Sequence, residues 1–163
     1  DIPSRGLIGL RSQMLTATAG EAIMAHRFSE YKPFKGAIPS RINGVLISKN
    51  QGQATAYSIE KLQDRGRFFV DPGEEVYMGM IVGEQNKPGD LVVNIVEGKQ
   101  LNNMRAAGKD KDGNIAPKVL MTLEECMEYI QADEAIEVTP NFIRMRKKLL
   151  SEEDRKRAER GRA

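Results

Sequence analysis

The sequence has few of the side chains that most enzyme and metal sites require. Its 163 residues include one cysteine, Cys126, one histidine, His26, and no tryptophan. A lone cysteine cannot form an internal disulfide, and with a lone histidine it makes a structural zinc site implausible. Any catalytic histidine would have to be His26, which lies in a predicted strand and is better explained by packing. The composition therefore predicts no catalytic residue and no metal site.

Long apolar runs and phosphate-binding loops are also missing. No apolar stretch approaches the roughly 18–20 residues of a membrane span, and residues 1–5 do not form a basic-then-apolar leader. We therefore expect a cytoplasmic protein with no membrane partner. The paired glycines Gly6 and Gly9 do not continue into a loop that ends in Gly-Lys-Ser/Thr, so the chain should hold no GTP and no other cofactor.

The first 39 residues carry patterns for one helix, one strand and a linker. Apolar side chains at helical spacing predict a helix over residues 6–17 that ends near Gly20, and residues 22–31 read as a strand. One helix and one strand cannot bury both faces of a sheet, so the partner strands are expected upstream of residue 1. Residues 32–39 contain two prolines and a glycine, which indicates a linker.

The remaining residues predict a separate β-rich domain. Short apolar runs alternate with glycine-containing turns, a pattern typical of a small barrel, and one helical segment is expected over residues 58–63. The fold class is thus α+β. The predicted strands cover residues 44–48, 54–58, 67–70, 75–82 and 91–96.

The C-terminal part predicts a helix, a hairpin and a second helix. Thr122 and Glu125 form a capping box at the start of an apolar helical stripe that includes Cys126. Residues 135–139 and 142–148 alternate around Pro140-Asn141, which predicts a β-hairpin. Alternation places Ile136, Val138, Ile143 and Met145 on the core face and basic residues on the other. Ser151 should cap the last helix.

The distribution of charge favours a polyanionic partner. Residues 98–118 lack apolar periodicity and carry five basic against two acidic side chains, and residues 144–163 carry nine basic against four acidic ones. Lysine and arginine neutralise phosphates, and asparagine bonds sugar or base edges. A merely solvated loop and a solvated charged helix are the alternatives. The candidate RNA contacts are Lys99, Asn102, Asn103, Arg105, Lys109, Lys111 and Lys118, with a second patch of Arg144, Arg146 and Lys148.

Several motifs along the whole chain resemble the BipA/TypA family of bacterial translational GTPases. The motif at residues 5–12 is shared with related translation factors, whereas the later ones resemble the tail domain peculiar to this family. The resemblance implies that residues 1–35 are the last helix and strand of a ferredoxin-like domain V similar to that of elongation factor G, and that residues 36–163 are the family-specific C-terminal domain. The motifs are residues 5–12, 43–48, 62–66, 75–83, 102–106, 121–125 and 137–140.

The same resemblance implies a function on the ribosome. The full-length protein would hydrolyse GTP with Mg²⁺ on the ribosome, in ribosome assembly and stress-adaptive translation, through N-terminal domains that this chain lacks. The tail domain would contact ribosomal RNA and the acceptor end of the A-site tRNA, and the loop after residues 102–105 would reach toward the peptidyl-transferase region.

Two other functions are compatible with the residues. Methionines such as Met78, Met80 and Met104 could give the barrel a surface that binds a partner protein, with the charges only keeping it soluble. A hydrolase would need Cys126 as nucleophile with His26 as its base.

Overall fold

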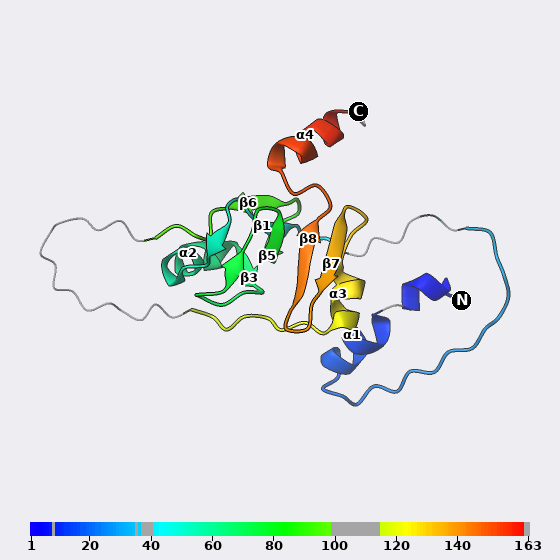
Figure 1. The fold of residues 1–163 in the computed structure, drawn as a ribbon. Helices are drawn as coiled ribbons and strands as arrows, with labels where there is room; N and C mark the ends of the chain where they lie inside the picture. Colours follow the sequence, from blue (N-terminus) through cyan, green and yellow to red (C-terminus); the bar gives the residue numbers. More distant parts are fainter. Residues whose placement is uncertain (8, 35, 37–40, 99–114, 162–163) are drawn as a thin grey trace, which may run out of the picture. The chain divides into compact units, whose positions relative to one another are not determined.

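The structure is a computed structural model that describes residues 1–7, 9–34, 36, 41–98 and 115–161. The chain divides into two compact units, Asp1–Ser40 and Arg41–Ala163, whose elements are shown in Figure 1. None of the described helices is both long and apolar enough to cross a membrane.

The first unit contains a short 3-10 turn, Ser4–Leu7, and helix α1, Leu10–Ala17. The helix ends at Ala17, and Ala19, with a φ of 51°, takes the left-handed conformation that commonly follows a helix. The N–H of Gly20 then donates to the carbonyl of Leu15 at 2.7 Å and completes the cap. The helix predicted over residues 6–17 is therefore confirmed over Leu10–Ala17.

The strand predicted over residues 22–31 is not formed in the described part of the first unit. Residues 21–34 carry neither helix nor ladder assignment, and Ile23 and Tyr31 are each 95% exposed. A strand needs a hydrogen-bonded neighbour, and the described residues of this unit supply none. The prediction of a strand over residues 22–31 is therefore wrong for this structure, because an apolar pattern alone cannot create the ladder.

The second unit is built on a mixed sheet with strand order β6-β1-β5-β8-β7, in which β3 also pairs with β5. The described strands form no closed ring, since β6 and β7 end this order. Strands β2 and β4 pair with each other in a separate ribbon. The strands are β1 Val45–Ser48, β2 Gly52–Gln53, β3 Gly66–Phe68, β4 Glu75–Val76, β5 Met80–Gln85, β6 Leu91–Val93, β7 Glu134–Val138 and β8 Ile143–Lys147.

Strand β5 determines how far the β7–β8 hairpin is supported by the sheet. One edge of β5 pairs with β1, and the other is shared by β3 and β8. Strand β8 pairs with β5 at two positions, Arg146 opposite Met80 and Met145 opposite Ile81. The sheet therefore holds the base of the hairpin, and the tip extends past the last pairing with β5.

Two apolar clusters cover the two faces of the sheet. All four residues of β1 are buried, because Leu46 packs into one cluster while Val45 and Ile47 pack into the other. Successive strand side chains point to opposite faces, so a strand covered on both sides has no solvent face. Ile59 of helix α2, Ala56–Leu62, lies in the first cluster, and Cys126 of helix α3, Leu123–Tyr129, lies in the second.

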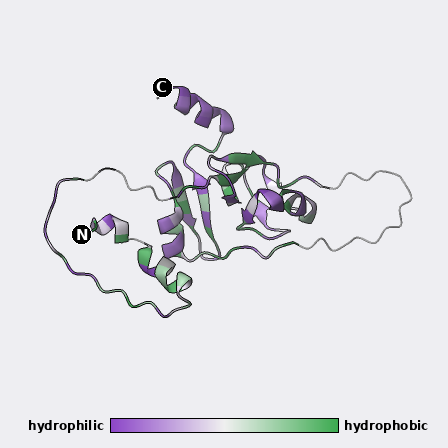
Figure 2. Ribbon diagram, turned by 180° about the vertical axis from the view of Figure 1, so that it is seen from behind, coloured by the Kyte–Doolittle hydropathy of each residue, from purple (hydrophilic) through white to green (hydrophobic). Residues whose placement is uncertain are grey.

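The helix ends in the second unit follow local capping chemistry. The hydroxyl of Thr122 accepts from the N–H of Glu125, whose carboxylate accepts from the N–H of Thr122 at 2.8 Å, so the predicted capping box is confirmed. Helix α4, Glu152–Arg160, begins after Ser151, whose hydroxyl accepts from the N–H of Glu153. Figure 2 shows α4 as hydrophilic along its length, whereas the strands of the sheet carry both hydrophilic and hydrophobic residues.

The α+β class and the order of most elements are confirmed, with one change of type. The segment predicted as a strand over residues 54–58 is instead the start of α2, a helix expected only from residue 58. The hydroxyl of Thr55 accepts from the N–H of Ser58 and caps the helix, and this local signal outweighs the β-forming residues around it.

Candidate nucleic-acid interface

Most of the predicted RNA contacts lie outside the described residues. The structure places four of the predicted side chains: Lys118, Arg144, Arg146 and Lys148. The predicted contacts Lys99, Asn102, Asn103, Arg105, Lys109 and Lys111 fall within residues 99–114, outside the described ranges.

Lys118 is bound to carboxylates of its own domain. Its ammonium lies 3.0 Å from the carboxylate of Asp71 and also forms an ion pair with Glu74. The hydrogen bonds to Glu74 and Asp71 raise the pKa of Lys118 above its usual value. This charge is neutralised within the chain, so Lys118 is a weaker candidate for a phosphate contact than the sequence indicated.

Arg146 and Arg144 lie on one face of β8 but have different partners. The guanidinium of Arg146 is 2.6 Å from Glu137, whose carboxylate also accepts from the Tyr77 hydroxyl at 2.5 Å. Burial, with the bond to Glu137, raises the pKa of Tyr77, so the hydroxyl stays a donor. The guanidinium of Arg144 lies over the ring of Phe142, 4.4 Å from its centroid. Of these two arginines, Arg146 is paired with a carboxylate, whereas Arg144 has no carboxylate partner in the described part of the chain.

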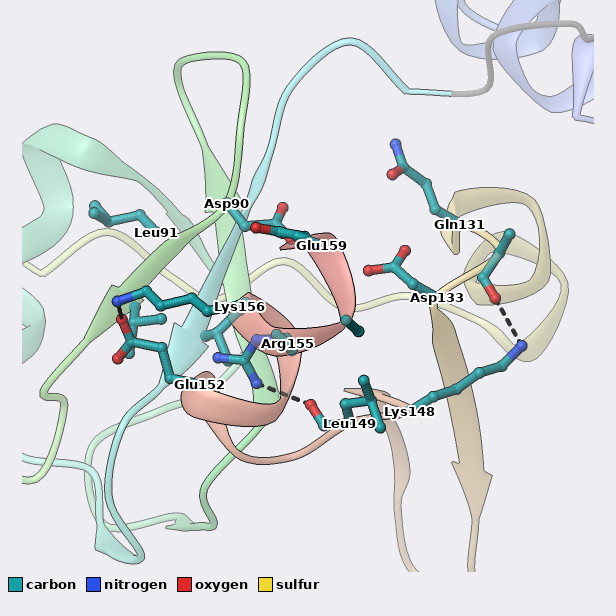
Figure 3. A pocket seen from close by; sticks show the side chains of 14 residues that line it. Asp90, Leu91, Gln131, Asp133, Lys148, Leu149, Glu152, Arg155, Lys156 and Glu159 are labelled. Atoms are coloured by element: carbon teal, nitrogen blue, oxygen red, sulfur yellow. Dashed lines mark hydrogen bonds and ion pairs between the residues drawn. The ribbon is translucent and has the colours of Figure 1, made fainter. Parts of the chain in front are cut away.

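Lys148 lies at the other end of the hairpin strand, beside α4. Its ammonium donates to the carbonyl of Ala132 at 2.6 Å, and its side chain lines a cleft between α4 and the edge of the sheet (Figure 3). At a strand rise of about 3.3 Å per residue, it is roughly 13 Å from Arg144. The structure therefore does not bring the three residues of the predicted second patch together at one point.

The cleft beside α4 has a volume of about 930 Å³ and a mixed charge. Its basic side chains are bound within the chain: Arg155 donates to the carbonyls of Leu149 and Leu150, and Lys156 pairs with Glu152 at 2.6 Å. Acidic residues, including Asp90 and Glu159, also line it (Figure 3). A polyanion would meet carboxylates in this cleft as well as cations, so the cleft lacks the uniform positive charge that a phosphate-binding surface needs.

A buried ion cluster at the base of the hairpin fixes its position. Lys147 is 1% exposed, and its ammonium lies 2.6 Å from Asp90, 2.7 Å from Asp133 and 2.8 Å from Glu134. Burial by itself would lower the pKa of Lys147, but the hydrogen bonds that its ammonium donates to Asp133, Asp90 and Glu134 outweigh this effect and raise the pKa. The cluster joins β8, the start of β7 and the turn before β6.

The carboxylates of this cluster do not form a metal site. Asp90, Asp133 and Glu134 are close enough together to share a cation, with ligand atoms within 4.8 Å of one another in the described residues. The Lys147 ammonium lies within 2.8 Å of all three and takes the position that an ion would need. The residues therefore fit a buried salt-bridge cluster rather than a metal.

Comparison with known families connects this architecture to translation factors. A sequence model of the elongation factor G C-terminus matches residues 1–42, and a model of the TypA/BipA C-terminal domain matches residues 43–152. The chain belongs to the TypA/BipA family. The hairpin, the buried cluster and α3 all lie within the residues that match the TypA/BipA domain.

Relatives in this family share about half of the residues. The chain is 48% identical over 98% of its length to the large ribosomal subunit assembly factor BipA of Salmonella typhimurium, and 48% identical over 96% to that of Bacillus subtilis. Identity to the Haemophilus influenzae protein of the same name is 49% over 98%. The chain spans 26% of the length of each of these relatives.

The hydrolase alternative is not supported in this TypA/BipA-family chain. Cys126 is 3% exposed on the core face of α3, and burial raises the pKa of its thiol, with a smaller contribution from Glu125. A nucleophilic cysteine needs the opposite shift and an accessible sulfur. His26 lies in the first unit, in the segment without helix or ladder assignment.

Two features of the interface were missed in the sequence. The sequence pattern predicts Phe142 as an ordinary strand residue, although its aromatic ring is two positions from a basic residue, on the same strand face. Lys147 was not considered, although it continues the inward alternation of Ile143 and Met145. An inward lysine requires an acidic partner, and the buried Glu134, directly opposite in the hairpin register, supplies it together with the more exposed Asp133.

Proposed function

We propose that this chain is the ribosome- and RNA-contacting part of a translational GTPase that acts in assembly of the large ribosomal subunit, in the cytoplasm. The observation that carries the proposal is identity of 48% along 98% of the chain to a protein named large ribosomal subunit assembly factor BipA. We extend it to contacts with ribosomal RNA and the A-site tRNA and to a role in translation under stress.

In this proposal, GTP and Mg²⁺ are bound by domains of the full-length protein outside this chain. The first 35 residues would belong to a domain similar to elongation factor G domain V, and residues 36–163 would form the family-specific domain. Support for this division comes from the two family models, which meet at residues 42 and 43. The chain itself would act without catalysis, by binding.

The proposed RNA contacts of residues 98–118 can be tested directly by removing their positive charges. Replacing Arg105, Lys109 and Lys111 together by Ala should weaken co-sedimentation with ribosomes while leaving the thermal unfolding temperature unchanged. Each lost phosphate contact on single-stranded RNA lowers the dependence of log affinity on log salt by about 0.7, so the slope should fall by roughly 2.

A charge-matched control separates specific contacts from a general loss of positive charge. Lys49, Arg65 and Lys87 are exposed and form no ion pair within the described residues, so their joint replacement by Ala removes the same charge elsewhere. The control should retain most of the ribosome binding. Equal binding by the Arg105, Lys109 and Lys111 variant and the wild type would eliminate the proposed loop contacts.

A protein-binding module is the second candidate function, because apolar side chains are exposed around the hairpin and α3. Leu120 is 79% exposed, Met127 63% and Val138 61%. Of the methionines considered earlier, Met78 is 44% exposed, Met80 is buried, and Met104 lies outside the described residues. If the chain remains associated with its partner after ribonuclease treatment and in high salt, the contact is with protein, and this alternative is favoured.

A further inference from the structure

We propose that the tip of the β7–β8 hairpin is a stacking platform for an unpaired RNA base, formed by Phe142 with Arg144. The inference rests on the proposed function, which supplies the RNA, and it specifies an unpaired base as the group bound at the hairpin tip. It is carried by three features of the tip: a fixed backbone, a cation without a counter-charge and an exposed aromatic ring.

The backbone of Phe142 is held on both sides by Thr139. The N–H of Phe142 donates to the Thr139 hydroxyl at 3.0 Å, while its carbonyl accepts from the Thr139 N–H at 2.9 Å and hydroxyl at 3.1 Å. Pro140 also fixes one backbone angle of the turn between them. A ring mounted on such a turn loses little conformational freedom when a ligand stacks on it, which favours binding.

The charge of Arg144 is available to an incoming anion. Its cross-strand neighbour Glu137 is directly opposite in the register but forms its ion pair with Arg146. Arg144 is left with the ring of Phe142, 4.4 Å from its guanidinium carbon, and has no carboxylate partner in the described residues. The same strand thus carries one neutralised and one free guanidinium.

The ring of Phe142 is exposed where the sheet no longer covers the hairpin. It is 49% exposed, and the last pairing of β8 with β5 lies three residues away, at Met145. An aromatic ring of this size normally gains by burial, so an exposed ring beside a free guanidinium indicates a surface completed by a ligand. The ligand must offer a flat face and a negative charge.

An unpaired nucleotide supplies both groups at once. Bases that are not in a duplex stack on aromatic rings and on guanidinium planes, and the adjoining phosphate pairs with the cation. A purely apolar protein surface would instead bury the Arg144 charge without neutralising it, which is unfavourable. The chemistry of the tip therefore favours single-stranded RNA over a hydrophobic partner.

Because the chain contains no tryptophan, a Phe142→Trp variant provides a direct optical test. In the 163-residue chain, addition of a short single-stranded RNA should quench the tryptophan fluorescence, and the duplex of the same sequence should quench it far less. A Phe28→Trp variant serves as control, because Phe28 is 68% exposed in the first unit and its ring neighbour is Tyr31. Quenching that is equal for both variants, or equal for duplex and single strand, would overturn the platform.

Affinity measurements on conservative variants complete the test. Phe142→Leu should weaken binding of the same RNA by roughly 5- to 100-fold, the range for loss of one stacked base, whereas Phe142→Tyr should bind nearly as tightly as wild type. Circular dichroism should show both variants folded. If Phe142→Leu binds RNA normally but loses association with ribosomal proteins, the tip is a protein-docking site and the inference is wrong.

The two proposals fail in different ways. Normal RNA binding by Phe142→Leu, together with loss of ribosome binding by the Arg105, Lys109 and Lys111 variant, rejects the platform and leaves the proposed function intact. Absence of binding by the wild-type chain to both ribosomes and RNA would reject the platform and contradict the proposed function.

Discussion

Two cations on strand β8, Arg144 and Lys147, are three residues apart and lie in opposite environments. Lys147 is 1% exposed and touches three carboxylates, whereas Arg144 lies over an exposed ring with no carboxylate partner in the described residues. An odd spacing along a strand places two side chains on opposite faces. Residues of the same charge therefore serve different purposes here: Lys147 fixes the base of the hairpin, and Arg144 is left free near its tip.

Removal of the buried cation should have the largest effect on stability. Lys147→Met should lower the free energy of unfolding by about 3 kcal/mol, because removing one member of a buried ion cluster leaves its partners desolvated and unpaired. Urea unfolding followed by circular dichroism measures the change. Lys148→Met is the matched control, since Lys148 is exposed and bonds only a carbonyl, and it should change stability by no more than about 0.5 kcal/mol. Equal effects would show that Lys147 is not a fixed point of the fold.

A smaller effect on stability is expected from Asp133, the more exposed carboxylate of the same cluster. Burial opposes ionisation of Asp133, but its bond to Lys147 outweighs this and lowers the pKa below 3.8. A lowered pKa in the folded state stabilises the protein above pH 3.8, and this contribution is lost as pH falls through the folded value. Because Asp133 is 53% exposed, solvent screening limits the contribution to roughly 0.2–1 kcal/mol.

The Asp133→Asn variant tests this pH dependence. The difference in unfolding free energy between wild type and variant should be constant at neutral pH and should shrink as pH falls below 3.8. A difference that grows on acidification would show that the carboxylate is not stabilised by Lys147.

The smallest effect on stability is expected at Arg144. Arg144→Gln removes an exposed cation–π contact and should lower the free energy of unfolding by about 0.5 kcal/mol. The urea midpoint should hardly move, while affinity for single-stranded RNA should fall and become less sensitive to salt. A loss of stability close to that of Lys147→Met would remove the distinction between the two ends of the strand.

Local signals in the sequence predicted those parts of the fold that depend on neighbouring residues. The capping box at Thr122 and the cap at Ser151 are formed as expected, because each needs only residues within one turn. The hairpin around Pro140 was also predicted within one residue of its observed strands. The strand predicted over residues 54–58 is wrong, because Thr55 caps a helix there although the neighbouring side chains favour a strand.

Long-range features could not be derived from the pattern alone. Val138 and Ile143 were expected in the core but are 61% and 42% exposed, because the hairpin extends past its pairing with β5. Alternation indicates which side chains share a face, but only the three-dimensional arrangement decides whether that face is covered. The partners of Lys118 are likewise 44 and 47 positions away in the sequence, so no local signal revealed that its charge is neutralised.

The attachment of Arg41 has a mechanical consequence for the β-rich domain. Its guanidinium donates two hydrogen bonds to the carboxylate of Glu134, at 3.1 and 2.7 Å. It also lies over the ring of Tyr129, 4.6 Å from the centroid. Two hydrogen bonds fix the orientation of the guanidinium as well as its distance from the carboxylate. The chain therefore enters β1 in a fixed direction. Glu134 also pairs with Lys147, so one buried carboxylate joins the residue that precedes β1 to the base of the hairpin.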